Sequence, residues 1–454
     1  MLSSTAGSLR RFGRRHTSPQ LRRVAYRVRM ALFDAVVRLL FFAVGLPALY
    51  LLEPISRLRI GELRVDHIGH LAIEPELLLR QLRLDGPGRA TRLFFMHGAP
   101  SNRQLFGMWR RRLNVVAIRG QLLWRAFLSV KPLLARTRFN QPFPAVSSGW
   151  GGGERCHQVM AGAGPQLAFT PAEEARGQAE LRRMGLPEGA WFVVFHARDP
   201  VYYAALSGYR RQYKPEFRDM SIDTMFPAMQ RIAASGGYAI RVGAVVEKAL
   251  PDLGPRVIDY ATHYRTDFMD IYLCAKARFM MASNSGLCSV GQIFDTPVGF
   301  SNVFPYYTVP SGKGATYIRM FLRDRRTGDL LSFPEIKRRG LLQCPPHLAQ
   351  ALFRETYYDE RALDIVHNDA EDITNLCMDM MDRFEGRRPR PEAVRLEEMH
   401  RMLYDGVDRS PEAGRISPRF AMRHAHLIEP LAGDGAVAEL ASSSISVGRV
   451  SQRK

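Results

Sequence analysis

The sequence predicts an α/β protein with two doubly wound domains that face a cleft. Apolar strand-like runs alternate with amphipathic helices along most of the chain, which is the pattern of βαβ units in parallel sheets. The length of 454 residues exceeds that of one ordinary domain. Hydrophobic residues make up 46% of the chain and charged residues 24%, as is usual for globular proteins.

Changes in composition divide the chain into five expected parts. They are a basic arm with an apolar membrane-associated segment at 1–57, a first Rossmann-like domain at 58–172, a second at 173–385, a helical extension at 386–430 and a disordered tail at 431–454. The tail is assigned as disordered because its composition has low complexity.

The charge of the chain favours anionic partners. The formal net charge is +20, and residues 1–30 hold eight arginines and no acid. Nucleic acid ranks low among these partners, because the basic excess lies in one arm without interleaved aromatic residues. The five cysteines show no C-x-x-C spacing, which argues against a zinc site or a disulfide framework.

The apolar stretch behind the basic arm is interrupted by Asp34 and Arg38. Its uninterrupted part, 39–52, contains Pro47 and is shorter than the roughly 20 residues of a spanning helix. We therefore expect an interfacial or re-entrant anchor on the anionic cytoplasmic face of the inner membrane. The alternative interpretation is a transit peptide, which is also rich in Arg and Ser.

Strands and helices of the first domain are expected in a regular order. Residues 62–72 look like a strand that ends in a Gly/His turn, 73–84 have the spacing of a helix, and 91–98 is a buried strand. A helix at 102–113 and a strand at 114–118 follow, and the Gly-rich run 147–158 is expected to be a flexible loop.

The second domain shows the clearer strand–helix alternation. Its expected strands are 191–196, 238–243, 256–261, 278–283 and 297–302, and its expected helices are 221–237, 266–277 and 286–295.

Polar residues follow three of these strands, where ligands bind in open parallel sheets. Arg198 and Arg241 supply guanidinium groups suited to phosphate, and the stretch ASNSGL brings a helix start with free N–H groups. Together they predict a diphosphate-binding site formed by the two arginines with Ser283, Asn284, Ser285 and Gly286. The alternative is an ordinary helix cap with nothing bound.

Two further residues are weighed as part of this site. Arg218 could reach the same anion, and the alternative is a surface arginine. His196 could donate to a phosphate or act on a leaving group, although a single histidine at a strand end is more often structural.

A base that deprotonates an acceptor hydroxyl is sought in the first domain. Asp66, His67, His70 and Glu74 are the candidates, and the sequence does not choose among them. Alternatively, the two acids pair with nearby arginines. No P-loop, dinucleotide fingerprint, H-E-x-x-H or G-x-S-x-G occurs. No D-x-D ends a strand, so we expect no cofactor and no metal, and the arginines would neutralise the leaving group.

Several segments taken together resemble a family of bacterial glycosyltransferases tied to surface-polysaccharide gene clusters. They include FHARDP, FRDMSIDTMFPAMQRIAASGGYAIRVG, TDFMDIYLCAKARFMMASNSGL, IGELRVDHIGHLAIEPELLL and GRISPRFAMRHAHLI, and the resemblance spans roughly residues 58–427. It implies a GT-B fold, with a nucleotide-sugar donor in the second domain and an acceptor in the first. The H-x-R at 196–198 is also similar to fucosyltransferase-like enzymes, in which the arginine meets the donor diphosphate, although no second arginine follows here.

These observations favour a metal-independent glycosyltransferase that moves a sugar from a nucleotide-sugar donor to a lipid-linked or nascent glycan acceptor. The alternative is a non-catalytic scaffold that binds a phosphorylated ligand in a polysaccharide assembly complex.

Overall fold

The computed structural model divides the chain into two compact units. The residues that it describes are 19–86, 88–143, 153–202, 217–343, 345, 348, 351–404 and 410–429. Unit 1 comprises 1–62, 89–97 and 115–142, and unit 2 comprises 63–88, 98–114 and 143–454. The basic arm before residue 19, residues 144–152 and the tail after 429 lie outside the described residues. The flexible loop expected at 147–158 is wrong for its second half, because residues 153–158 form the start of α6 (Gly153–Gly162).

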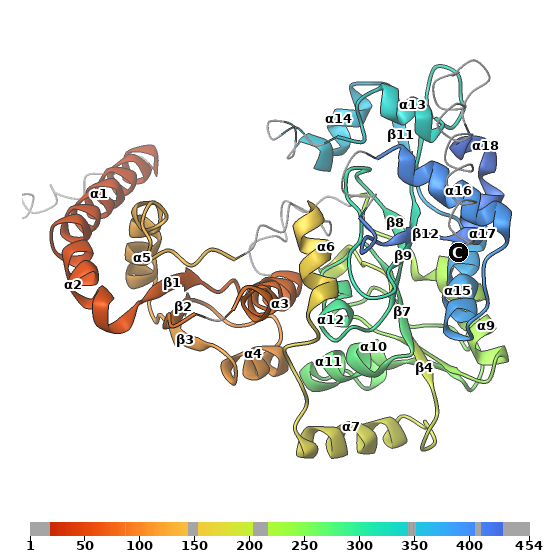
Figure 1. Ribbon diagram of the computed structural model, residues 1–454, viewed down its shortest axis with the longest axis horizontal. Helices are drawn as coiled ribbons and strands as arrows, with labels where there is room; N and C mark the ends of the chain where they lie inside the picture. The colour runs from red at the N-terminus through yellow and green to blue at the C-terminus, as the bar shows by residue number, and fades with distance from the viewer. Residues whose placement is uncertain are drawn as a thin grey trace, which may run out of the picture. The chain divides into compact units, whose positions relative to one another are not determined.

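Unit 1 combines a long N-terminal helical segment with a small sheet (Figure 1). The sheet has the order β1-β2-β3, and β1 pairs parallel with β2. The elements are α1 (Pro19–Leu40), the π-helical turn η1 (Phe41–Gly45), α2 (Leu46–Ser56), β1 (Arg59–Glu62), β2 (Arg92–Met96), β3 (Asn114–Ala117, whose first residue falls in unit 2) and α5 (Gln121–Leu134).

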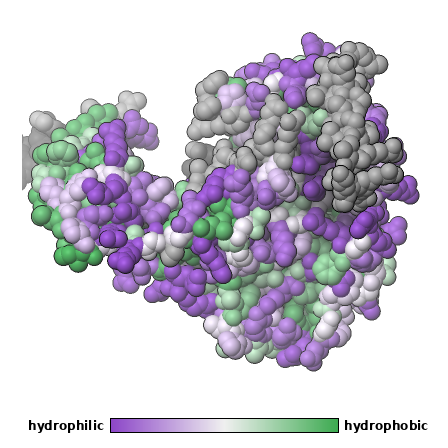
Figure 2. Space-filling view, in the orientation of Figure 1, coloured by the Kyte–Doolittle hydropathy of each residue, from purple (hydrophilic) through white to green (hydrophobic). Residues whose placement is uncertain are grey.

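The N-terminal helical segment is longer than the sequence suggested. A helix over Arg23–Ser56 is long and apolar enough to cross a membrane by length and composition alone, and none of its most apolar window is buried. Figure 2 shows hydrophobic residues on the surface over α1 and α2. The helix continues through Pro47, which lies near the start of α2 directly after the π-helical turn Phe41–Gly45.

A seven-stranded sheet forms the centre of unit 2. The strand order is β12-β9-β8-β7-β4-β5-β6, and every pair of neighbours in it is parallel. From β4 the chain proceeds to β5 and β6 on one side, and then to β7, β8 and β9 on the other. The strands are β4 (Phe192–His196), β5 (Tyr238–Arg241), β6 (Val257–Asp259), β7 (Phe279–Ser283), β8 (Val298–Val303), β9 (Thr316–Arg319) and β12 (Arg415–Ile416). This order creates a topological switch point between β4 and β7.

Helices cover both faces of this sheet, as a doubly wound fold requires (Figure 1). The helices α9 and α15 pack on one face, and α11 and α12 lie on the other. The remaining elements surround this framework, and β10 pairs antiparallel with β11. The helices are α3 (Ile68–Asp85), α4 (Arg103–Arg110), α6 (Gly153–Gly162), α7 (Pro171–Arg183), η2 (Ile222–Met225), α9 (Phe226–Ala234), α10 (Tyr260–His263), α11 (Asp267–Lys276), α12 (Cys288–Ile293), α13 (Phe333–Arg338), η3 (Ala351–Phe353), α14 (Glu355–Asp359), α15 (Ala370–Phe384), α16 (Pro391–Met402), α17 (Pro418–Arg423) and α18 (Ala425–Ile428), and the two strands are β10 (Phe321–Asp324) and β11 (Leu363–Val366). The mixed α/β class with parallel sheets is therefore confirmed.

Two helices expected in the first domain belong to unit 2 instead. The helix α3 packs against α12 and α6, and α4 packs against α11. The buried Arg80 explains this placement of α3, because it donates to the carbonyl oxygens of Met160 and Ala163 at 2.6 and 2.7 Å and pairs with Asp295 at 2.8 Å. The strand expected at 62–72 is also wrong in its extent, since β1 ends at Glu62 and the helix begins at Ile68.

Replacing Gly177 by Ala is expected to lower the free energy of unfolding by about 1–3 kcal/mol, the usual cost of overpacking. A Cβ at Gly177 of α7 would lie 2.1 Å from the ring of Tyr272, a buried residue of α11. Gly107→Ala in α4 is the matched control, because nothing lies within 4 Å of its added Cβ. Urea denaturation of both variants checks this, and equal midpoints would contradict it.

Candidate functional site

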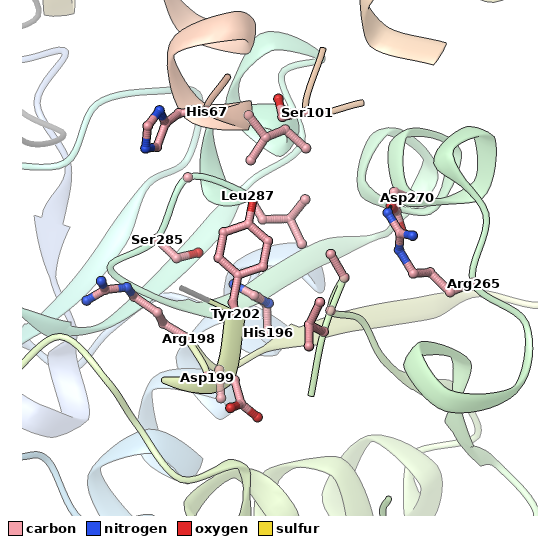
Figure 3. Close-up of a pocket in the computed structure, with 17 residues that line it drawn as sticks. His67, Ser101, His196, Arg198, Asp199, Tyr202, Arg265, Asp270, Ser285 and Leu287 are labelled. Carbon is pink, nitrogen blue, oxygen red and sulfur yellow. Dashed lines mark hydrogen bonds and ion pairs between the residues drawn. The ribbon is translucent and has the colours of Figure 1, made fainter. Parts of the chain in front are cut away.

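A pocket opens at the topological switch point, where the carboxyl ends of β4 and β7 meet (Figure 3). The last residue of β4, His196, is in register with Ala282 of β7. The segments after the two strands therefore leave the sheet side by side. All parts of the pocket wall belong to unit 2: it is lined by His67, Ile68, Gly69, Ser101, His196, Ala197, Arg198, Asp199, Tyr202, Gly243, Ala244, Val245, Arg265, Asp270, Ser285, Gly286 and Leu287.

Arg198 lies in the pocket wall directly after β4. Its backbone N–H donates to the Ser283 hydroxyl at 2.8 Å, which ties the loop after β4 to the end of β7. Its side chain is only 6% exposed, and the guanidinium lies 3.4 Å from a carboxylate oxygen of Asp219. The pocket therefore has a nearly buried guanidinium in its wall, balanced by a carboxylate at a long ion-pair distance.

The stretch 283–286 divides into a structural half and a pocket half. The Ser283 hydroxyl accepts a hydrogen bond from the Arg198 backbone N–H, and the Asn284 amide donates to the carbonyl oxygen of Phe304 at 3.0 Å. Ser285 and Gly286 instead line the pocket. The prediction that all four residues contact a ligand thus fits only the second pair, while the first pair fixes the shape of the turn.

Gly286 brings this turn against the beginning of α3. A Cβ on Gly286 would lie 3.0 Å from the backbone nitrogen of Gly69 and 3.2 Å from Ile68. Such distances are tight, and a methyl group here would displace its neighbours by a few tenths of an ångström. The turn after β7 and the start of α3 therefore approach each other closely at this glycine.

Arg241 and Arg218 do not line the pocket. Arg241 was expected to bind a diphosphate beside Arg198, but its guanidinium donates to the carbonyl oxygen of Lys248 at 2.7 Å and pairs with Asp259 at 3.3 Å. Asp259 lies directly across from it on β6, so Arg241 forms an ion pair within the sheet edge. Arg218 is half-buried beside Asp219.

His196 lines the pocket as an uncharged imidazole. Burial lowers the pKa of His196 to about 4, and its Nδ1 lies 3.2 Å from the carbonyl oxygen of Val242. Since a carbonyl can only accept, Nδ1 carries the proton and Nε2 is an acceptor. In this tautomer Nε2 presents a lone pair, so donation to a phosphate would need a second proton, and action on a leaving group stays a prediction.

The four candidate bases form two pairs near the start of α3, Asp66 with His67 and His70 with Glu74. His67 lines the pocket, and its Nδ1 lies 2.9 Å from the carboxylate of the exposed Asp66. His70 and Glu74 form a second pair at 3.0 Å, and Glu74 is also paired with Arg64. Neither member of this second pair lines the pocket. Burial lowers the pKa of His70 to about 4.

Arg265 and Asp270 also line the pocket, although the sequence indicates only a helix start for Asp270 and carries no signal for Arg265. They pair at 2.9 Å, and Asp270 accepts a hydrogen bond from the Tyr260 hydroxyl at 2.8 Å. Burial raises the pKa of Asp270 to about 6. Residues 265–270 follow β6, so the rule that ligands bind beyond the carboxyl ends of parallel strands would have pointed to them. Ser101 and Tyr202 were missed as well, since a lone Ser or Tyr in a loop carries no signal.

No cluster of three or more His, Cys, Asp or Glu side chains placed to hold a metal ion occurs among the residues that the structure describes.

Comparisons with known proteins identify distant structural likenesses only. No family model and no curated protein matches the chain. A family 9 glycosyltransferase from Veillonella parvula is 11% identical over 58% of this chain and 86% of its own, with a TM-score of 0.38. The ADP-heptose lipopolysaccharide heptosyltransferase II of E. coli is 12% identical over 57% and 90%, with a TM-score of 0.35. A UDP-N-acetylglucosamine 2-epimerase is 11% identical over 74% and 99%, with a TM-score of 0.24. Likenesses at this level establish neither an activity nor a ligand.

Proposed function

We propose that the protein is a metal-independent glycosyltransferase that moves a sugar from a nucleotide-sugar donor to a lipid-linked or nascent glycan acceptor. The observation that supports this most is the composition of the switch-point pocket. It brings an arginine suited to a diphosphate and a carboxylate-linked histidine suited to a hydroxyl into one cavity. The resemblance of the chain to glycosyltransferases of surface-polysaccharide clusters agrees with this reaction class.

Arg198 would bind the donor diphosphate together with Ser285 and the backbone at Gly286. A guanidinium presents parallel N–H donors that match phosphate oxygens, and its attraction strengthens where water is excluded. Arg198 is nearly buried, and its carboxylate neighbour is 3.4 Å away, so a diphosphate could replace that pairing. The same charge would stabilise the nucleoside diphosphate as it departs.

His67 would act as the general base, with Asp66 as a positioning residue. The Asp66 carboxylate fixes Nδ1 as the protonated nitrogen, so Nε2 can accept a proton from the acceptor hydroxyl. The hydroxyl oxygen then forms a bond to the anomeric carbon, and the bond from that carbon to the diphosphate oxygen breaks. The electron pair leaves with the nucleoside diphosphate.

The helical segment 23–56 would hold the enzyme at the cytoplasmic face of the inner membrane. Its exposed apolar surface and the preceding arginines suit an anionic bilayer. A membrane-bound acceptor of a surface polysaccharide would then be close to the pocket-bearing chain.

Thermal unfolding in the presence of UDP-, GDP-, CMP-, dTDP- and ADP-sugars tests this function. One donor class is expected to stabilise the protein, by about 2.7 kcal/mol at a concentration 100 times the Kd. Arg198→Ala should abolish this shift. Arg182→Ala is the control, since Arg182 is an exposed arginine of α7 outside the pocket.

Two results would contradict the proposal. If no donor shifts the melting temperature, the scaffold alternative gains ground. An equal shift in Arg198→Ala and the unaltered protein would remove Arg198 from the donor site.

A further inference from the structure

We infer that unit 1 inserts into one leaflet of an anionic phospholipid bilayer as a two-helix platform, in which α5 enters the lipid beside α1 and α2. The inference rests on the membrane attachment in the proposed function and goes beyond it. It adds α5 as a second membrane element and states that the N-terminal helix lies in the membrane plane.

Asp34 and Arg38, the two charged residues that interrupt the apolar helix, form hydrogen bonds with α5 inside unit 1. Asp34 accepts two hydrogen bonds from Arg125 of α5, at 2.9 and 2.7 Å, and one from the Ser129 hydroxyl at 2.6 Å. Arg38 donates to the carbonyl oxygen of Ser129 at 3.1 Å. These residues occupy positions i and i+4 on both helices. They join α1 to α5 along one side of α1.

An apolar stripe winds along α1. Its members recur at intervals of four residues, and each is more than half exposed: Val24, Val28, Leu32, Val36 and Leu40. Such a series drifts by about 40° per step around a helix, and its middle members Leu32 and Val36 lie nearly opposite Asp34, which is two residues from each of them. The exposed apolar surface continues beyond α1 through Phe42, Val44, Leu51, Leu52 and Ile55.

Contacts along the helix argue against a spanning orientation. Beyond the joint with α5, Tyr50 of α2 packs edge-on against Phe139 at 4.9 Å, with Arg138 over its ring at 5.2 Å. From Asp34 to Tyr50 the helix rises about 24 Å, most of the hydrocarbon thickness. If the helix crossed the bilayer, Arg125 and Arg138 would be carried into the acyl chains. A helix in the interface keeps both at the level of the headgroups.

The helix α5 adds apolar surface of its own. Its aromatic side faces the sheet, where Trp124 stacks on His97 at 5.5 Å and Phe127 lies 5.1 Å from Phe95. Leu122 and Leu123 in the first turn are nevertheless 59% and 65% exposed. None of the described residues covers these two leucines. A lipid surface would cover them. Exposed basic residues on the same unit, including Arg119, Arg136 and Arg138, match anionic headgroups.

Flotation of the full chain with vesicles provides the first test. Binding is expected to phosphatidylcholine vesicles that contain phosphatidylglycerol, and more weakly to phosphatidylcholine alone. Leu123→Glu should weaken binding about tenfold or more, because an exposed apolar contact becomes a charge. Val394→Glu, at an exposed apolar site on α16 of unit 2, should bind as the unaltered chain does. Equal binding of both variants would exclude α5 from the lipid.

Protease access to terminal tags in intact spheroplasts tests the orientation. An in-plane helix leaves both tags on the cytoplasmic side, so neither should be cleaved before lysis. Cleavage of either tag in intact spheroplasts would show a spanning helix and overturn the inference. Self-association that Leu123→Glu abolishes, without vesicle binding by the unaltered chain, would show that a second copy covers this face instead.

The membrane inference and the proposed glycosyltransferase function can be tested separately. Leu123→Glu lies outside the pocket, so its thermal shift with the donor nucleotide-sugar should equal that of the unaltered protein. A protein that binds vesicles but no donor would refute the glycosyltransferase and leave the membrane platform intact.

Discussion

Replacing His67 by Ala is expected to lower kcat by about 10²–10⁴-fold, the usual contribution of a general base. His67 is the candidate base that lines the pocket, and Asp66 holds its Nδ1 at 2.9 Å. Donor binding should persist, because the diphosphate would contact Arg198 on the other wall. Turnover with the identified donor, together with donor-induced thermal shifts, measures the two effects separately.

Two further variants distinguish the pairs of α3. Asp66→Asn should lower kcat less than His67→Ala and leave KM nearly unchanged, since Asp66 orients the imidazole without touching the acceptor. His70→Ala is the control from the second pair, and its kcat should stay within a few-fold of the unaltered enzyme. The opposite ranking, with His70→Ala inactive and His67→Ala active, would move the base to His70 and Glu74.

Replacing Arg80 by Met is expected to lower the free energy of unfolding by about 3–5 kcal/mol, the cost of removing one partner from a buried ion pair. Arg80 is fully buried and binds Glu76 at 2.6 Å in addition to three backbone carbonyls and Asp295. The variant leaves Glu76 as a buried carboxylate without its cation. Urea denaturation measures the loss, and the paired variant Glu76→Met with Arg80→Met should recover part of it.

The loss should depend on pH in a defined direction. Burial raises the pKa of Glu76, and Arg80 limits this rise. Without Arg80 the folded-state pKa rises further above the unfolded value near 4.5. A group with a raised folded-state pKa contributes its stability below the unfolded pKa and loses it as the pH rises. The deficit of Arg80→Met should thus be smaller at pH 5 than at pH 8. A pH-independent deficit would mean that Glu76 does not titrate in the variant.

The rule that ligands bind at the carboxyl ends of parallel strands predicted the position of the pocket, because the parallel register is a local property of the sheet. Residues 192–196 and 279–283 are apolar, and their carboxyl ends lie at one edge, so Arg198 and Ser285 could be placed together from sequence. The rule failed for Arg241, since the direction of its side chain is set by Asp259 on the adjacent strand. A cross-strand ion pair between residues 18 positions apart leaves no periodic signal.

The division of the chain into two units could not be predicted from the sequence for a similar reason. The periodicity of residues 73–84 predicts a helix but not the surface against which it packs. That surface is set by the bonds of Arg80, whose partners lie 80 to 215 residues further along the chain. The prediction of an interfacial or re-entrant anchor rested on the interruptions by Asp34 and Arg38 and on Pro47 in the short run between them and residue 52. The compensation of the two charged residues by α5 became visible only when Arg125 and Ser129 were placed beside them.

The close approach of Gly286 to Gly69 holds the turn after β7 against the start of α3. Both glycines belong to unit 2, together with the histidine and the arginine on the two walls. Side chains around the rim can therefore diversify while the backbones of the two walls keep their spacing. The exposed apolar residues of α1, α2 and α5 can likewise change without altering this spacing, because none of them takes part in the glycine contact.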